Sequence, residues 1–228
     1  MESTEKDSLH PTSSCQTTAW LAAAIALLVI AADQAVKLYV KTHFYLGESV
    51  TIFPWFELRF VQNNGMAFGF EFGSKLLLTI FRVVVVGALI WYICKLCRRP
   101  DVKRGYIVTL SLIAAGAFVN IIDCVFYGMI FNNPFPPFVA QFVPWGEGYA
   151  GVFHGLVVDM LYFPLFSFVW PSWIPLVGGS TFSFFDPVFN IADAAISVGF
   201  ILLIFFYAKY LPSGSKEEKS QSADSPEE

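Results

Sequence analysis

Four long apolar stretches divide the chain, separated by segments in which polar and charged residues return. They run from about 20 to 40, from 76 to 96, from 105 to 123 and from 188 to 208. An α-helix rises about 1.5 Å per residue, so about 20 apolar residues cross the ~30 Å hydrocarbon core of a bilayer. The pattern therefore predicts an all-α membrane protein with four transmembrane helices.

The connection over 43–74 carries a second periodicity. Its FELRFV alternates apolar and polar residues, which is typical of a strand with one buried face, and Asn63-Asn64-Gly65 follows as a turn signal. We therefore expect a small β-sheet on the outer face of the membrane.

The connection between the third and fourth helices, 124–187, is rich in Phe, Trp, Tyr and Pro. Aromatic side chains suit the interface between lipid and water, and prolines interrupt helices. A rival count of six spans would use 151–178, but Asp159 and three prolines there oppose it. The prediction is a long aromatic outer loop, with an insertion at about 124–158.

The composition agrees with a membrane protein. Of 228 residues, 56% are hydrophobic and only 14% are charged, with 25 Phe. The net charge of −4 makes nucleic acid an unsuitable partner. Cys94 and Cys97 form a lone C-x-x-C without a second pair or a nearby His, so we interpret them as small apolar residues rather than a metal or redox site.

The charges also predict the orientation. The link between the second and third helices holds five Lys or Arg against one Asp, which places it in the cytoplasm by the positive-inside rule. Four spans then put both termini there, as a polar tail at 1–19 and a disordered Ser-rich tail at 211–228, around a membrane domain at 20–210. The first tail is polar and mixed in charge, unlike a secretory signal peptide, so the first apolar segment is expected to stay as an anchor.

This topology places the acidic and amide side chains within the predicted spans, together with Lys37, at the outer ends of the helices. Scattered structural hydrogen bonds give no reason for such segregation, whereas a site opening to the outer surface does. The residues are Asp33, Lys37, Asn120, Asp123, Asn190 and Asp193.

The candidate chemistry is acidic, because H-E-x-x-H, G-x-S-x-G, Walker and dinucleotide-binding motifs are all absent. Two carboxylates in a site of low dielectric share one proton, so the charged member can activate water while the other donates to a carbonyl oxygen. Asp193, at the mouth of the fourth helix, is the first candidate. Spacing leaves its partner open between Asp159 and Asp123.

Two other functions would also use buried polar residues. A proton-coupled transporter needs carboxylates at several depths, whereas here they gather in one leaflet. A scaffold that binds helices through polar groups would tolerate Asp193→Asn. The segregation favours an enzyme, with the transporter as the alternative.

Four blocks, in order, resemble the lipoprotein signal peptidase family, also called signal peptidase II. They are DQAVK from Asp33, NNGMAF from Asn63, GAFVNIID ending at Asp123, and VVD ending at Asp159 together with FNIAD ending at Asp193.

The resemblance implies a metal-free and cofactor-free aspartic endopeptidase of the bacterial inner membrane. It would cleave diacylglyceryl-modified prolipoproteins before the lipidated cysteine, work as a monomer among membrane lipids with its site on the periplasmic side, and bind globomycin-type inhibitors. The catalytic pair implied is Asp159 and Asp193. The supporting or substrate-binding residues implied are Asp33, Lys37, Asn63, Gly65, Asn120, Asp123 and Asn190.

The chain departs from the family pattern in three places. Cys124 stands where the family has Arg, and Val119 stands where it has Gly before the Asn. The gap between Asp123 and Asp159 is also much longer than usual. We interpret this insertion as a lid or interfacial flap.

Overall fold

The computed structural model describes residues 13–64 and 75–210. Gly65 and the tail at 211–228 lie outside the described residues, so the predictions for them stay predictions.

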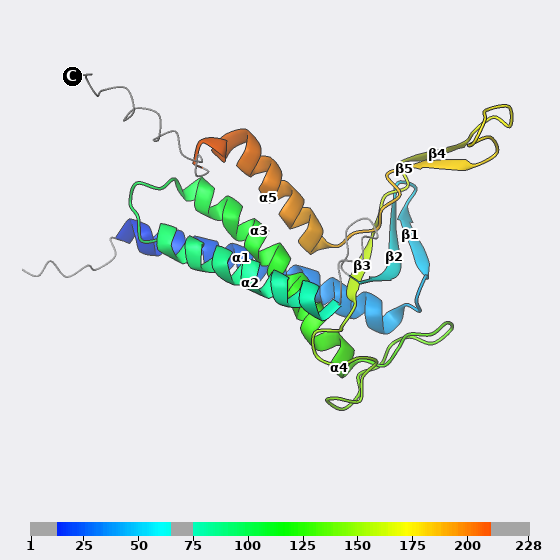
Figure 1. Cartoon of the computed structure of the whole chain (residues 1–228), viewed down its shortest axis with the longest axis horizontal. Helices are drawn as coiled ribbons and strands as arrows, with labels where there is room; N and C mark the ends of the chain where they lie inside the picture. Colours follow the sequence, from blue (N-terminus) through cyan, green and yellow to red (C-terminus); the bar gives the residue numbers. More distant parts are fainter. Residues whose placement is uncertain (1–12, 65–74, 211–228) are drawn as a thin grey trace, which may run out of the picture.

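In the part of the chain that the structure describes, four helices form the bundle: α1 (Ser13–His43), α2 (Lys75–Leu96), α3 (Arg104–Ile122) and α5 (Ile191–Tyr207). Within the described ranges, α1, α2 and α3 with its extension are long and apolar enough to cross a membrane, and α5 is a shorter apolar helix of 17 residues. A three-stranded sheet lies at one end of the bundle (the sheet end), and the start of α1 and the end of α5 lie at the other (the tail end), as Figure 1 shows.

Two helix boundaries differ from the sequence prediction. Helix α1 begins at Ser13 rather than near residue 20, and its added turns bury Cys15 and Thr18. Helix α3 does not stop at Asp123. It continues as a π-helical turn, η2 (Asp123–Tyr127), and a last turn, α4 (Gly128–Ile130). The polar break predicted at Asp123 is wrong because this carboxylate finds partners inside the protein and has no need of water.

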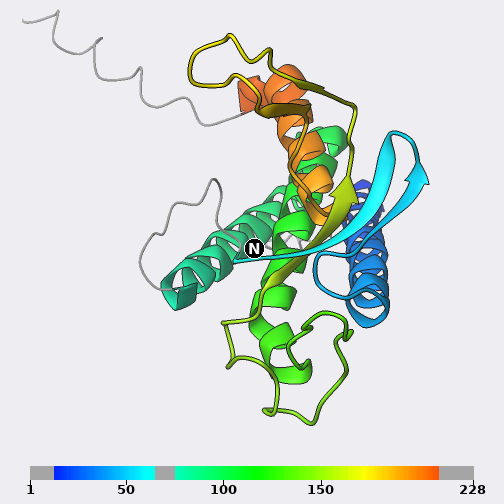
Figure 2. The ribbon, with the colours of Figure 1, turned by 90° about the vertical axis from the view of Figure 1, so that its right-hand side faces the viewer.

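The predicted sheet is present, but its third strand comes from far along the chain. Strands β1 (Ser49–Phe53), β2 (Phe56–Asn63) and β3 (Val157–Tyr162) pair antiparallel in that order. Strand β2 contains the alternating FELRFV segment. Asp159 was expected in a loop, but it lies in β3 opposite Val61. In Figure 2 the sheet lies across the end of the bundle.

A second hairpin follows β3 and was not predicted. Strands β4 (Phe166–Val169) and β5 (Thr181–Phe184) pair with each other and project outward beyond the sheet, away from the helix bundle (Figure 1). Every residue of 151–178 is described and none of them is helical, so the rival count of six spans is wrong.

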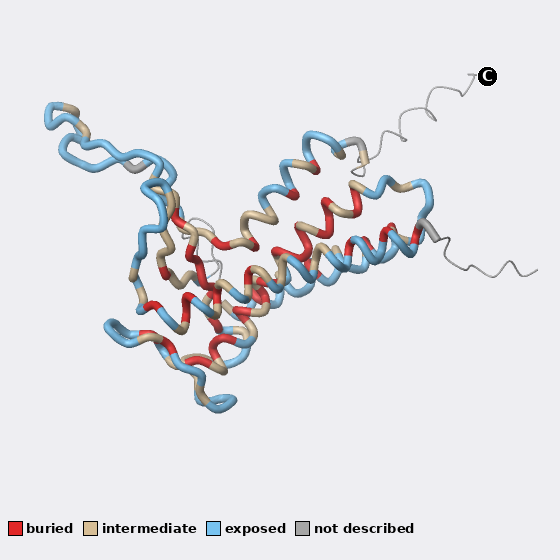
Figure 3. Tube along the Cα trace, turned by 180° about the vertical axis from the view of Figure 1, so that it is seen from behind, coloured by how far each residue is buried: buried red, intermediate tan, exposed pale blue. Residues whose placement is uncertain are grey.

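Close helix packing orders the bundle around α3. A Cβ on Gly116 would collide with the backbone of Ala192, and one on Gly199 would meet Ile113, so both glycines let α3 and α5 approach closely. Val119, where the family has Gly, is itself completely buried. Buried residues follow α3 along its length (Figure 3), and an apolar cluster at the tail end joins α1, α2, α3 and α5.

Candidate active site

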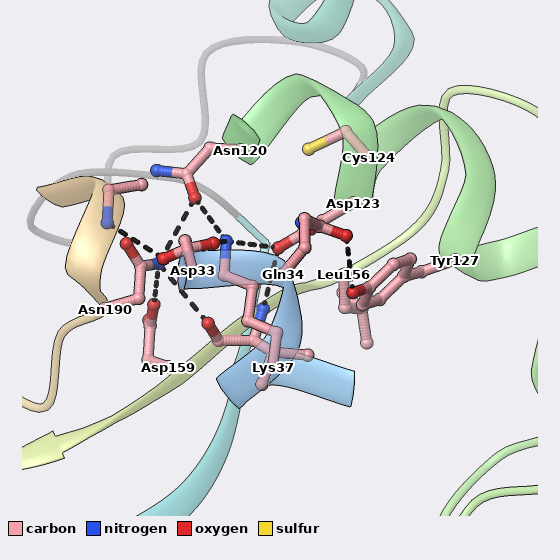
Figure 4. Close-up of polar contacts among 12 residues, drawn as sticks. Asp33, Gln34, Lys37, Asn120, Asp123, Cys124, Tyr127, Leu156, Asp159 and Asn190 are labelled. Carbon is pink, nitrogen blue, oxygen red and sulfur yellow. Dashed lines mark hydrogen bonds and ion pairs between the residues drawn. The ribbon is translucent and has the colours of Figure 1, made fainter. Parts of the chain in front are cut away.

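Lys37 is the centre of the polar cluster at the sheet end. It lies one turn after Asp33 on α1, so the two side chains share a helix face. Its ammonium contacts Asp33 at 2.8 Å and Asp123 at 2.7 Å, and donates to Asn120 Oδ1 at 2.8 Å. All three charged side chains are fully buried. Figure 4 shows Lys37 between these partners, which come from α1 and from the end of α3.

The carboxylates of Asp33 and Asp123 also accept hydrogen bonds from uncharged groups. Asp33 Oδ1 accepts from the backbone N–H of Ala192 at 2.9 Å, which ties α1 to the start of α5. Asp123 accepts from Gln34 Nε2 at 2.8 Å, and the Tyr127 hydroxyl donates to Gln34 Oε1 at 2.9 Å. Pairing and hydrogen bonds of this kind offset the cost of burying these charges.

The start of α5 presents Asn190 and Asp193 together. Asn190 is the N-cap, and its side-chain oxygen accepts from the backbone N–H of Asp193 at 2.8 Å. The Asp193 carboxylate accepts in return from the backbone N–H of Asn190 at 3.3 Å, which completes a capping box. Asn120 Nδ2 donates to Asp193 Oδ1 at 2.9 Å, so α3 fixes the same carboxylate.

Asp159 faces this cap from strand β3. Its Oδ1 accepts from Asn190 Nδ2 at 2.7 Å, and its Oδ2 accepts from Asn63 Nδ2 at 2.8 Å. The side chain is almost completely buried. Burial is the main cause that raises the pKa of Asp159 to about 7, and the negative charge of Asp193 adds to the rise while the Asn63 hydrogen bond opposes it.

The structure thus separates four acidic residues into two pairs. Asp33 and Asp123 share the Lys37 ammonium. Asp159 and Asp193 are bridged by Asn190 and, among the described residues, form no ion pair. Among the described residues, no Lys or Arg forms an ion pair with Asp159 or Asp193, so this second pair lacks a cation that would hold both members in the charged form.

Every predicted site residue within the described ranges joins one hydrogen-bonded network. Sequence reasoning missed two of its members, Gln34 and Tyr127. Tyr127 lies one helical turn after Asp123 on the extension of α3. Its spacing of four residues from Asp123 would have placed both side chains on one helix face, but the helix was predicted to end at Asp123. Gln34 was visible only as part of the DQAVK block.

Cys124, which stands where the family has Arg, lies beside an arginine of another helix. Cys124 is buried, and Arg82 of α2 approaches its sulfur with Nη1 at 4.0 Å. A guanidinium from another helix therefore lies beside the position where the family carries its own Arg. In the residues that the structure describes, no cluster of three or more His, Cys, Asp or Glu could hold a metal ion.

Comparisons with known proteins show the family. The family model described as signal peptidase (SPase) II matches residues 25–209. The chain belongs to the signal peptidase II family. The lipoprotein signal peptidase of Porphyromonas gingivalis is 47% identical over 206 residues, covering 86% of this chain and 91% of the relative. That of Amoebophilus asiaticus is 37% identical over 191 residues, covering 81% and 76%.

Solved structures support the fold independently. Two bacterial membrane enzymes determined by the in meso method, at 1.9 and 2.3 Å resolution, superpose with TM-scores of 0.54 and 0.55. They share 24% and 23% identity with this chain and cover 85% and 87% of it, and 94% and 93% of their own chains are matched. This member of the signal peptidase II family is therefore a bacterial membrane peptidase with apolar helices and a small sheet.

Proposed function

We propose that the chain is an aspartic endopeptidase that removes signal peptides from diacylglyceryl-modified prolipoproteins, cutting just before the lipidated cysteine. The observation that carries the proposal is the Asp159–Asn190–Asp193 bridge, in which Asp159 accepts from the side-chain amide of Asn190 and Asp193 accepts from its backbone N–H. The substrate class comes from the relatives, which are named lipoprotein signal peptidases.

The reaction follows from one shared proton. Asp193 takes a proton from water as the water oxygen attacks the scissile carbonyl, and protonated Asp159 donates its proton to the carbonyl oxygen. The resulting gem-diol then collapses: Asp159 takes back a proton from one hydroxyl, and Asp193 delivers its proton to the leaving nitrogen. Asp159 suits the acid role because burial keeps its pKa near 7. The mechanism needs no metal and no covalent intermediate.

Lys37 supports this chemistry without taking part in it. Its ammonium binds Asn120 Oδ1, which leaves the Asn120 amide nitrogen to donate to Asp193. It also offsets the charges of Asp33 and Asp123, and Asp33 holds the backbone of Ala192 beside Asp193. The cluster thereby fixes the amide that orients Asp193.

The proposed topology has four spans, with both termini in the cytoplasm and the site on the periplasmic side of the inner membrane. The Lys- and Arg-rich link between α2 and α3 lies at the tail end, which supports this orientation. The diacylglyceryl chains of the substrate would stay in the bilayer while the peptide meets the aspartates at its boundary. Globomycin-type inhibitors would bind at the same aspartates, as the family implies.

The β4–β5 hairpin would lie on the lipid surface beside the site. Residues 164–185 contain no charged side chain, and large apolar groups such as Trp173 and Leu176 are highly exposed. A two-stranded hairpin leaves backbone groups unpaired at its edges, so it cannot enter the hydrocarbon core. The headgroup region accepts both the aromatic side chains and the polar edges.

Cleavage in vesicles tests the proposal. The purified protein should release the signal peptide from a diacylglyceryl-modified prolipoprotein and leave the unmodified precursor intact. A folded protein that cleaves neither, and instead acidifies the vesicle lumen under a proton gradient, would contradict the proposal and favour the transporter.

A further inference from the structure

Lys41 is a second buried lysine on α1, one helical turn after Lys37. Its side chain is completely buried, and in the described ranges its ammonium has no hydrogen-bond acceptor. Four aromatic rings surround it instead. Their centroids lie 5.7 Å (Phe60), 5.7 Å (Tyr127), 5.0 Å (Phe131) and 5.2 Å (Tyr149) from Nζ.

These distances place the ammonium within reach of all four ring faces. A ring face is electronegative, and its attraction for a cation is strongest where water is excluded. A buried ammonium is costly unless something compensates the lost hydration. The four rings therefore stabilise the charge of Lys41, together with the attraction of the Asp123 carboxylate, and the charge in turn draws the rings together.

The rings come from three separate segments. Phe60 belongs to strand β2, Tyr127 and Phe131 belong to the extension of α3 and the residue after it, and Tyr149 belongs to the segment 144–156 (the returning arm). The arm runs back along the α3 extension: the backbone N–H of Tyr149 donates to Phe131 O, that of Ala150 to Gly128 O, and that of Gly155 to Cys124 O. The arm belongs to the insertion that distinguishes this chain from the family pattern.

The four rings around Lys41 (the aromatic cage) connect to the site through two tyrosine hydroxyls. The Tyr149 hydroxyl accepts from the backbone N–H of Leu156 at 2.7 Å, and Leu156 directly precedes strand β3, which carries Asp159. The Tyr127 hydroxyl donates to Gln34, which binds Asp123. Thus Tyr149 fixes the start of strand β3, and Tyr127 supports the Asp123 carboxylate through Gln34.

We propose that Lys41 is a positioning residue. Its ammonium gathers the four rings and thereby holds the returning arm, through Tyr149, where β3 presents Asp159 to Asn190. The returning arm of the insertion then acts as a brace that holds strand β3 in place. The inference rests on the proposed function for its kinetic consequence, because it assigns Asp159 a catalytic role.

The kinetic test separates the charge from the bulk of the side chain. Lys41→Met keeps the length and removes the charge, whereas Lys41→Arg keeps the charge and the stacking on rings. We expect Lys41→Met to lower kcat about 10- to 100-fold, as displaced catalytic groups do, with KM within about twofold. Lys41→Arg should restore most of kcat. Lys95→Met is the matched control, since it removes an exposed cation from the Trp91 ring at the tail end, and it should leave kcat unchanged.

A second measurement does not depend on activity. Hydrogen exchange at the amide of Leu156 should become faster in Lys41→Met and in Tyr149→Phe, which loses only the hydroxyl, and should stay at the wild-type rate in Lys95→Met. Faster exchange without any peptidase activity in the wild type would keep the brace and overturn the proposed function. Wild-type exchange at Leu156 together with equal kcat for Lys41→Met and Lys41→Arg would overturn the role of Lys41.

Discussion

The two ends of the helix bundle are built from largely the same helices with opposite chemistry. At the tail end, side chains such as Ala22, Ile93, Leu110 and Leu203 pack without directional bonds, beside an apolar cavity of about 580 Å³. At the sheet end, hydrogen bonds and ion pairs between 2.7 and 3.3 Å hold the side chains of the site.

The difference predicts at which end of the bundle substitutions impair function. Apolar packing tolerates the exchange of one apolar side chain for another of similar volume, because dispersion and burial are not directional. A buried polar network does not, since each lost partner leaves a group unsatisfied in a site of low dielectric. Substitutions in the polar network at the sheet end should therefore reduce both cleavage and stability. Substitutions at the tail end that preserve volume should change neither.

The largest effect on stability is expected from Lys37→Met. It leaves the buried carboxylates of Asp33 and Asp123 without their shared cation, which costs about 3–5 kcal/mol of unfolding free energy. Thermal unfolding in detergent measures the loss. Arg99→Met removes one member of an exposed pair, 3.9 Å from Asp101, and should leave the midpoint unchanged. Equal midpoints for both variants would remove the distinction between the two ends.

The next largest loss of stability is expected from Gly116→Ala, because the added methyl would press on Ala192 and Ile196 of α5. Overpacking of this kind costs about 1–3 kcal/mol, and a shift of α5 would also move Asp193. Both the unfolding midpoint and kcat should fall. Gly87→Ala on α2 is the control, since nothing lies within 4 Å of its added methyl. If Gly116→Ala behaves like Gly87→Ala, α3 and α5 are not held together at this glycine.

The pH dependence of cleavage should reflect Asp159. The mechanism requires its proton, so kcat/KM should fall about tenfold per pH unit above its pKa of about 7. The same raised pKa means that the folded state binds this proton more tightly than the unfolded state, so the stability contributed by this group is present at low pH and is lost as pH rises from 3.8 to about 7. A rate that stays constant up to pH 9 would contradict the assignment of the proton to Asp159.

The smallest effect is expected from Cys94→Ser combined with Cys97→Ser. Both thiols are free and lie at the tail end, away from the carboxylates. Cleavage should proceed at the wild-type rate. A substantial loss of kcat in this folded variant would show that the tail end contributes to the chemistry after all.

The sequence predicted those elements whose signal is local. Helix α2 and strand β2 lie where continuous apolar length and strict alternation placed them. Strand β3 was missed because VVDMLY has no alternation, being buried on both faces. The continuation of α3 was missed because an Asp in an apolar segment suggests a helix end, and only the fold shows that Lys37 lies beside it.

The same limit applies to the site. Spacing alone left Asp123 and Asp159 equal as partners of Asp193, since what separates them is contact with a lysine 86 positions earlier than Asp123. Nothing in the sequence singles out Lys41 at the end of α1, because the four rings around it are scattered over 90 residues of sequence. Long-range contacts of this kind have no periodicity to detect.

Cleavage of a diacylglyceryl-modified prolipoprotein by Asp159→Asn, Asp193→Asn and Asp123→Asn, with and without EDTA, tests the catalytic pair most directly. We expect EDTA to leave wild-type cleavage unchanged. Asp159→Asn and Asp193→Asn should lose cleavage by about 10²-fold or more while remaining folded, and Asp123→Asn should lose stability but keep measurable turnover. Cleavage that persists in Asp159→Asn and vanishes in a folded Asp123→Asn would contradict it, because the reacting pair would then include Asp123.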